Sequence, residues 1–315
     1  MRRLTGAAIT IGIAVAVFAA PAGAKPTKLH ASSISVKAFD LSGTVDHYSG
    51  GFVGCPGTRK AFGGAGYWYD PMNAVSSFDA GLTAAIPDKG LNGVDGSGFA
   101  KYAGLVLRVE AFCAPRSKLK GAHVKKTTLP GPDSGNEPYL SGARVRCPSG
   151  ERAIGGGASW HPPGGGPPSS GTAGLFERAY IASSVPTVDG KGWYAMGADG
   201  WVGDGQVFTV EVVCIDAKRL GKVKAVHATR TVNTGNTGGQ TVECPKQMRI
   251  LAGGAYFAQP GFSLRSSRRV DPPPETYSTA ISYPFDNGKS WFANGANPGG
   301  PSRMQYTVQA LCLAK

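Results

Sequence analysis

The chain has 315 residues, with 33 Lys and Arg against 20 Asp and Glu, which gives a formal net charge of +13 at pH 7. Its 47 Gly and 23 Pro, with only 17% charged residues, argue against a helical bundle or a coiled coil. After the N-terminal segment no stretch keeps an apolar period of 3.6 residues over three turns, whereas short Val, Ile, Tyr and Thr runs recur between Gly and Pro. This pattern predicts an all-β protein.

Residues 1–24 have the three parts of a secretory signal peptide. Arg2 and Arg3 precede an apolar run that ends at Ala20, and Ala22-Gly23-Ala24 supplies the small residues of a cleavage site. A membrane anchor is the alternative, but the run is at the short end for a span, and Thr and Gly interrupt it. We therefore expect cleavage after Ala24, a secreted protein with no further transmembrane segment, and a charge of +11 once Arg2 and Arg3 are removed from the +13.

A cysteine-proline step opens three similar stretches, at Cys55, Cys147 and Cys244. Each step is followed by a basic residue, an apolar pair, several small residues and one or two aromatic residues. The second stretch, C-P-S-G-E-R-A-I-G-G-G (147–157), could be taken for a phosphate-binding loop. Such a loop normally occurs once and opens a helix, whereas this pattern occurs three times and leads into sequence typical of a strand. We interpret its glycines as scaffold.

The other three cysteines, Cys113, Cys214 and Cys312, end segments in which apolar residues alternate with other types. The residues two, four and six positions before each cysteine are apolar, so the cysteine lies on the apolar face. The intervening residues, which include Glu110, Glu211 and Gln309, suit a face in contact with solvent. Between the cysteines of a stretch, an Asp-Gly or Asn-Gly step predicts a hairpin turn.

These patterns predict a signal peptide (1–24) and three β repeats (25–113, 114–214 and 215–315). The expected fold is three tandem antiparallel β-sandwich-like repeats of about 95 residues, a size suited to small domains. The alternative is a single pseudo-threefold β-prism. An outer strand also recurs, because K-L-K-G-A-H-V-K-K-T (118–127) matches K-V-K-A-V-H-A-T-R-T (222–231), which aligns His123 with His227.

Six cysteines in an exported chain predict three disulfides, although six cysteines allow fifteen pairings. The threefold pattern favours Cys55–Cys113, Cys147–Cys214 and Cys244–Cys312, so that each disulfide closes its own repeat. The competing arrangement joins adjacent repeats through Cys113–Cys147 and Cys214–Cys244, and leaves Cys55 with Cys312. Zinc is not expected, because the sequence has no C-x-x-C spacing.

The combination of C-P-x-G-x-x-x-x-G-G-G, S-x-P…G-x-x-W-x-A and T-V-x-x-x-C resembles a short secreted β module of actinobacteria and phage-tail-like proteins. The resemblance covers nearly all of 30–315 as three copies. The third copy has Lys246-Gln247 in place of the glycine, and the first lacks the tryptophan. The resemblance implies an extracellular module used for display or attachment, without assigned catalytic residues. A weaker likeness is to threefold β-prism proteins of the vitelline-membrane type.

No catalytic set stands out in the sequence. His47 lies between Asp46 and Ser49, but adjacent residues of a strand face opposite ways, and there is no G-x-S-x-G elbow. The best candidates for an exposed aromatic contact with a sugar or a protein are Trp160, His161 and Trp201. The alternative for these residues is that they anchor a loop to its own domain.

We therefore expect a secreted, non-enzymatic binding or display protein of the cell envelope that needs no cofactor and no metal. Its basic charge suggests contact with an anionic cell-wall polymer, a glycan or another envelope protein, with no specific nucleic acid. One alternative is a passive structural protein of the envelope or matrix. Another is a secreted hydrolase with a site at a domain junction.

Overall fold

The computed structural model describes residues 27–42, 47–69, 80–100, 104–131, 140–162, 179–198, 205–233, 236–258, 278–285, 288–297 and 303–315. The predicted signal peptide lies outside these residues. No α-helix occurs in the described part of the chain, and eighteen strands account for most of it. The all-β prediction is confirmed. We call strands β1–β6 unit 1, strands β7–β12 unit 2 and strands β13–β18 unit 3.

The strands of unit 1 are β1 (Ser35–Ser42), β2 (His47–Gly54), β3 (Arg59–Tyr69), β4 (Ala80–Pro87), β5 (Gly93–Ala100) and β6 (Val106–Pro115). Those of unit 2 are β7 (His123–Pro130), β8 (Leu140–Arg146), β9 (Glu151–His161), β10 (Tyr180–Pro186), β11 (Gly192–Ala198) and β12 (Val207–Asp216). Those of unit 3 are β13 (Val223–Asn233), β14 (Asn236–Glu243), β15 (Met248–Ala258), β16 (Ser278–Phe285), β17 (Ser290–Asn297) and β18 (Arg303–Ala314). Two 3-10 turns, η1 (Ala31–Ser33) and η3 (Ala217–Arg219), precede β1 and β13.

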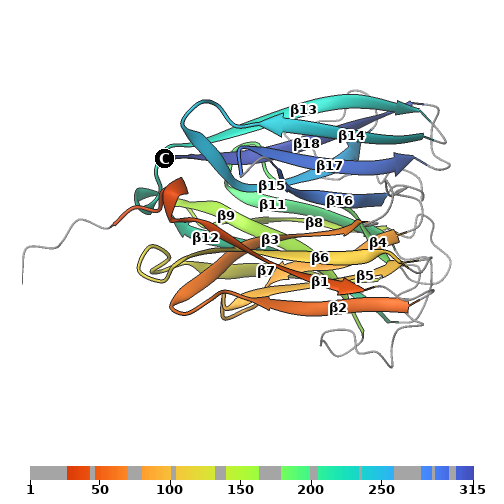
Figure 1. The fold of residues 1–315 in the computed structure, drawn as a ribbon, viewed down its shortest axis with the longest axis horizontal. Coiled ribbons are helices and arrows are strands. Elements are labelled where there is room, and N and C mark those ends of the chain that lie inside the picture. Colours follow the sequence, from red (N-terminus) through yellow and green to blue (C-terminus); the bar gives the residue numbers. More distant parts are fainter. Residues whose placement is uncertain are drawn as a thin grey trace, which may run out of the picture.

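The strands form three antiparallel six-stranded sheets, and every sheet is shared by two units (Figure 1). In each sheet the first, sixth and third strands of one unit are followed by the fourth, fifth and second strands of another. The orders are β1-β6-β3-β16-β17-β14, β13-β18-β15-β10-β11-β8 and β7-β12-β9-β4-β5-β2. Shared sheets are expected of the prism alternative and not of three separate sandwiches.

The two halves of one unit nevertheless face each other across an apolar layer. A Cβ atom added at Gly64 on β3 would lie 2.7 Å from Val94 on β5, and one added at Gly96 on β5 would lie 2.5 Å from Val109 on β6. Unit 1 is thus a sandwich whose two layers belong to different sheets. A neighbouring unit also covers the outward face of the central strands, so many residues of strands such as β9 and β12 are buried on both faces, whereas the edge strands β1, β7 and β13 are largely exposed.

The predicted disulfides Cys55–Cys113, Cys147–Cys214 and Cys244–Cys312 are confirmed, with Cα–Cα distances of 5.6 to 5.7 Å. They close loops of 58, 67 and 68 residues. Each joins the residue that follows the second strand of a unit to a residue near the end of its sixth strand. Because these two strands belong to different sheets, the disulfide ties the two layers of that unit together.

The glycines of the repeated stretch lie where backbones meet, which supports their interpretation as scaffold. A Cβ atom at Gly155 would overlap the carbonyl group of Phe62 on β3, and one at Gly254 would overlap that of Ser184 on β10. Gly64, Gly156 and Gly253 occupy the same step in the three units and face the opposite layer, where Val94, Trp193 and Trp291 cover them. These contacts leave no room for a side chain.

We predict that Gly156→Val disrupts folding, because a Cβ atom there would lie 2.5 Å from both the Glu211 carbonyl oxygen and the Trp193 ring. Overpacking of this kind is expected to cost about 3 kcal/mol of unfolding free energy. The matched control is Gly54→Val, because Gly54 lies on an edge strand and only the Phe52 ring lies within 4 Å. Equal denaturation midpoints for the two variants would contradict the scaffold interpretation.

We predict that Cys147→Ala combined with Cys214→Ala lowers the unfolding free energy by about 2–5 kcal/mol. Unit 2 shares one sheet with unit 1 and another with unit 3, so the loss is expected as one cooperative transition at a lower temperature. Calorimetry of the double variant checks this. Two well-separated transitions would show that the units unfold independently.

Candidate functional site

One end of the molecule gathers the disulfides and the turns that flank them, at the left of Figure 1 where the C-terminus is marked. We call it the cystine end. It contains the Cys-Pro turns (55–60, 147–152 and 244–249), the hairpin turns before the fifth strands (88–92, 187–191 and 288–289), and the connections between units (116–122 and 216–222). Lys315 lies there too, because its backbone N–H donates to the carbonyl oxygen of Gln247 at 3.0 Å.

The cystine end is strongly basic. These segments and Lys315 carry fifteen Lys and Arg residues, none of them buried, against four acidic residues. They account for +11 of the formal charge of +13, so the rest of the chain is close to neutral. The basic residues are Arg59, Lys60, Lys89, Arg116, Lys118, Lys120, Arg152, Lys191, Lys218, Arg219, Lys222, Lys246, Arg249, Lys289 and Lys315, and the acidic ones are Asp88, Glu151, Asp189 and Asp216.

Two crevices open at this end, where one unit meets the next. Crevice A, between units 1 and 3, has a volume of about 420 Å³. Its lining includes the apolar residues Ile34, Val36, Phe112 and Ile250 and the charged residues Glu110 and Arg249. Crevice B, between units 3 and 2, has a volume of about 300 Å³. Its lining includes Leu220, Val223, Ala225 and Leu311 with Arg152 and Asp189.

The two crevices have the same construction. The floor comes from the strand that ends in the second cysteine of a unit, and one wall comes from the hairpin turn of the neighbouring unit. At that turn stand Gly288 in crevice A and Gly190 in crevice B, both with a left-handed backbone (φ of 75° and 62°). The carbonyl oxygen of each glycine accepts a hydrogen bond from the residue six positions after a first cysteine, Ile250 or Ala153.

The third junction, between units 2 and 1, has a leucine at the same turn position. The carbonyl oxygen of Leu91 accepts the corresponding hydrogen bond from Ala61, and Leu91 is also left-handed, with φ of 57°. This conformation costs a side chain about 1–2 kcal/mol, and burial of a leucine contributes a similar or larger stabilisation. Leu91 is only 3% exposed and belongs to the same apolar cluster as Leu119 and Val213.

The geometry indicates that Leu91 fills the third crevice. A Cβ atom added at Gly190 would point toward Leu311, at 3.7 Å. Leu311 immediately precedes the second cysteine of unit 3, and Val213 immediately precedes that of unit 2. At its own junction, the side chain of Leu91 therefore points into the space that corresponds to the open space beside Gly190 and Gly288.

A buried polar position also recurs, three residues before each second cysteine. Glu110, Glu211 and Gln309 are 8%, 7% and 1% exposed. The expectation that these positions face solvent is therefore wrong, because a neighbouring unit covers the second face of the strand. Gln309 donates from Nε2 to the carbonyl oxygen of Pro186.

The two glutamates hold their protons more tightly than usual. Burial raises the pKa of Glu110 to about 7, although the charge of Arg108 and a hydrogen bond with Tyr67 favour the ionised form. Burial likewise raises the pKa of Glu211 to about 7, against the attraction of Lys126. The charges of Asp95 and Asp88 act in the same direction as burial at Glu211.

The surroundings of Glu110 differ from those of the corresponding residues in the other units. Two residues before Glu110 on β6, Arg108 forms an ion pair with Asp40, the residue opposite it on β1, with Nε and Oδ1 2.8 Å apart. At the equivalent positions units 2 and 3 each have two threonines, whose hydroxyl groups are joined by a hydrogen bond. Among the cavities formed by the described residues, Glu110 is the one of the three buried polar residues that lines a crevice, and it also lies beside an ion pair.

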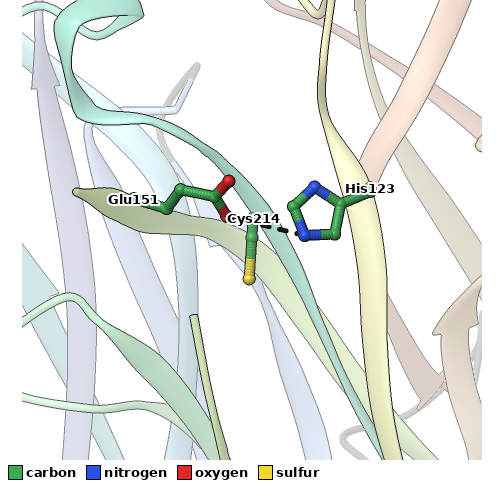
Figure 2. Close-up of side chains that lie close together, drawn as sticks. All are labelled: His123, Glu151 and Cys214. Atoms are coloured by element: carbon green, nitrogen blue, oxygen red, sulfur yellow. Dashed lines mark ion pairs between the residues drawn. The ribbon is translucent and has the colours of Figure 1, made fainter. Parts of the chain in front are cut away.

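Figure 2 shows a separate cluster on unit 2, formed by His123, Glu151 and Cys214. The His123 ring and the Glu151 carboxylate face each other, with Nε2 and Oε2 3.5 Å apart, while the sulfur of Cys214 points away from the ring. That sulfur is bonded to Cys147 and cannot serve as a thiolate ligand. Two ligands remain, fewer than the three or four protein ligands of a zinc site, so we interpret the cluster as an ion pair.

The predicted equivalence of His123 and His227 is wrong. His123 pairs with Cys214, whereas the residue that pairs with Cys312 is Lys224. His227 pairs with Gln309, three positions further along the neighbouring strand. The similar residue types of 118–127 and 222–231 align His123 with His227, but in the structure the strand pairing with the second cysteine makes Lys224 the counterpart of His123.

The predicted aromatic contacts are not brought together. The side chain of Trp160 is fully buried and donates from Nε1 to the carbonyl oxygen of Tyr180 at 3.2 Å, so it is not an exposed contact. His161 is half-buried at the end of β9 and contacts the hydroxyl group of Ser159. Trp201 lies outside the described residues. Trp160 corresponds in position to the buried Trp68, and that equivalence could have indicated a core role.

No protein-family model and no curated protein matches this chain. The resemblance to the secreted actinobacterial module therefore stays a prediction. In the described part of the chain there is no helix with the length and apolar character needed to cross a membrane.

We predict that the protein loses stability as the pH rises from 5 to 8. Over this range the folded state keeps protons on Glu110 and Glu211 that the unfolded state releases near pH 4.5, so unfolding becomes easier by up to about 3 kcal/mol per carboxyl group. Glu211→Gln should remove the part of this pH dependence that comes from Glu211. The variant should be more stable than the wild type at pH 8, because glutamine is the natural residue at the equivalent position of unit 3, Gln309. Urea denaturation at the two pH values measures this.

The matched control is Glu243→Gln, because Glu243 is exposed. It should leave the difference between pH 5 and pH 8 unchanged. A Glu211→Gln variant with the full wild-type pH dependence would show that the buried carboxyl group is ionised throughout this range.

Proposed function

We propose that the protein is an exported, non-catalytic binding protein that holds an anionic polymer on its cystine end. The observation that carries this proposal is the separation of charge, with fifteen basic and four acidic residues at one end and a nearly neutral remainder. Such a field attracts polyanions and raises their local concentration. Uniform charge for solubility alone would be distributed over the whole surface.

The basic residues stand on turns whose backbone is held in place. Cys55, Cys147 and Cys244 each donate a backbone hydrogen bond to the hairpin turn of their own unit, at 2.8 Å. The disulfides then fix these turns to the ends of the sixth strands. A preorganised array of cations loses little conformational entropy when a polymer binds.

This arrangement of cations suits recognition of the charge of a polymer and not of its sequence. The cations are spread over eight turns and connections, and one of them, Lys60, donates to the carbonyl oxygen of Gly90 at 2.9 Å. Disulfides persist in the oxidising conditions outside the cell, where teichoic-type polymers and acidic polysaccharides are the available polyanions. We therefore propose an anionic cell-wall polymer or acidic glycan as the partner.

We predict salt-sensitive retention on immobilised heparin, used as a model polyanion, at low ionic strength. Lys120→Gln combined with Lys222→Gln removes two exposed charges at the cystine end and should lower the slope of log affinity against log salt by up to about two. The measurement is the dissociation constant at several salt concentrations.

The matched control is Arg230→Gln combined with Arg303→Gln, which removes two exposed charges far along the strands from the cystine end. It should change binding much less. Equal losses in both double variants would indicate a response to net charge alone, and absence of retention at low salt would favour a passive structural role. Shortening of the polymer chain would favour the hydrolase alternative.

A further inference from the structure

We propose that crevice A binds a small neutral ligand that combines a branched aliphatic group with an amide N–H donor, as the leucyl group of a peptide does. This site is separate from the polymer-binding surface in its chemistry. The proposal rests on two independent observations, the leucine that fills the corresponding space at another junction and the buried carboxyl group in the crevice lining.

The aliphatic part is inferred from the three junctions of the fold. At the junction of units 2 and 1 the chain supplies its own occupant, because the Leu91 side chain fills the space beside the hairpin turn. At crevice A the turn residue is Gly288, and apart from its neighbours in the chain no heavy atom of the described residues lies within 4 Å of a Cβ atom added there. The crevice is lined by Ile34, Val36, Phe112 and Ile250, which suit an aliphatic group.

The polar part is inferred from Glu110. This residue is only 8% exposed and lines crevice A, and its Oε2 atom has no hydrogen-bond partner among the residues that the structure describes. A buried acceptor without a donor is costly, and an N–H group of a ligand in the crevice would satisfy it. Glu110 accepts such a bond whether or not the carboxyl group carries a proton on its other oxygen.

Charge decides between neutral and charged ligands. A cationic ligand would approach Arg249 in the same lining and the other cations of the cystine end, whereas an anionic ligand would face the oxygen atoms of Glu110. A cationic ligand is therefore disfavoured by Arg249, and an anionic ligand is disfavoured by Glu110. A neutral amide donor satisfies Glu110 without repulsion from Arg249.

Crevice B lacks this combination and serves as an internal comparison. Its acidic residue already has donors, because Asp189 accepts hydrogen bonds from Thr187 and from the backbone N–H of Lys191. The counterpart of Glu110 in unit 3, Gln309, does not line crevice B and donates to Pro186 instead. We therefore expect weaker binding in crevice B.

The test is an NMR titration of the full secreted chain with N-acetyl-leucinamide, with N-acetyl-glycinamide as the control that lacks the aliphatic group. We expect saturable shifts of the amide signals of Ile34, Val36 and Phe112, with a dissociation constant in the millimolar range that suits a ligand of this size. N-acetyl-glycinamide should bind at least tenfold more weakly. Absence of saturable shifts at these residues, or equal binding of the two probes, would overturn the proposal.

Two pairs of variants locate the site. Gly288→Leu places the natural residue of the third junction in crevice A and should abolish binding, whereas Gly190→Leu fills crevice B and should leave the affinity for crevice A unchanged. Glu110→Leu should weaken binding at least tenfold, and Glu110→Gln, which keeps an oxygen acceptor, should weaken it less than threefold. Retained affinity in a folded Gly288→Leu protein would place the ligand elsewhere.

Should Gly288→Leu fail to fold, Val36→Lys is the alternative, because Val36 is half exposed on an edge strand and tolerates a charge at the mouth of the crevice. The complementary experiment opens the third crevice with Leu91→Gly. N-acetyl-leucinamide should then raise the melting temperature of Leu91→Gly more than that of the wild type. Equal increases would contradict the assignment of Leu91 as the internal occupant.

Discussion

The close approach of backbones at the glycine-rich stretches is the constraint on which the rest of the structure depends. At Gly155 and Gly254 a neighbouring strand comes so near that no Cβ atom fits. The approach at Gly155 brings β9 against β3, and that at Gly254 brings β15 against β10. Phe62, Ile154 and Leu251, which occupy the same position in the three units, are buried. Because the strands meet so closely, each sheet can continue from one unit into the next, and the turns of all three units gather at one end.

That gathering explains how one end acquires both its charge and its crevices. A hairpin turn of one unit faces the sixth strand of its neighbour, and the residue at the left-handed turn position determines whether the space between them is filled. Leu91 fills it once, and the two glycines leave it open twice. Small differences between otherwise similar units therefore give the junctions different chemistry, most clearly in unit 1, where Glu110 and the Arg108–Asp40 ion pair replace the amide and hydroxyl groups of unit 3.

The sequence predicts the all-β class, the disulfide pairing and the scaffold role of the glycines, because each of these depends on local patterns that recur three times. It does not predict which faces of a strand are covered. Alternation of apolar residues correctly places Cys113 and Cys214 inside a unit, but it leaves Glu110 and Glu211 on a face that only the assembled sheets bury. Trp160 is instead buried within its own unit, where its ring centroid lies 4.8 Å from that of Phe208, and its equivalence with Trp68 is the signal that indicates a core role. The function of Leu91 depends on a turn conformation shared with two glycines, which residue types alone do not reveal.

The sheet order also has a consequence for the way the chain must be assembled. Strand β3, made early, finds its outer neighbour β16 only near the end of synthesis, and Leu29 is held by a short parallel bridge to Leu220. Contacts between positions so far apart in the chain slow folding. Until the last third of the chain is made, β3 therefore keeps one edge without a partner strand, and an unpaired edge of this kind can pair with other chains and aggregate.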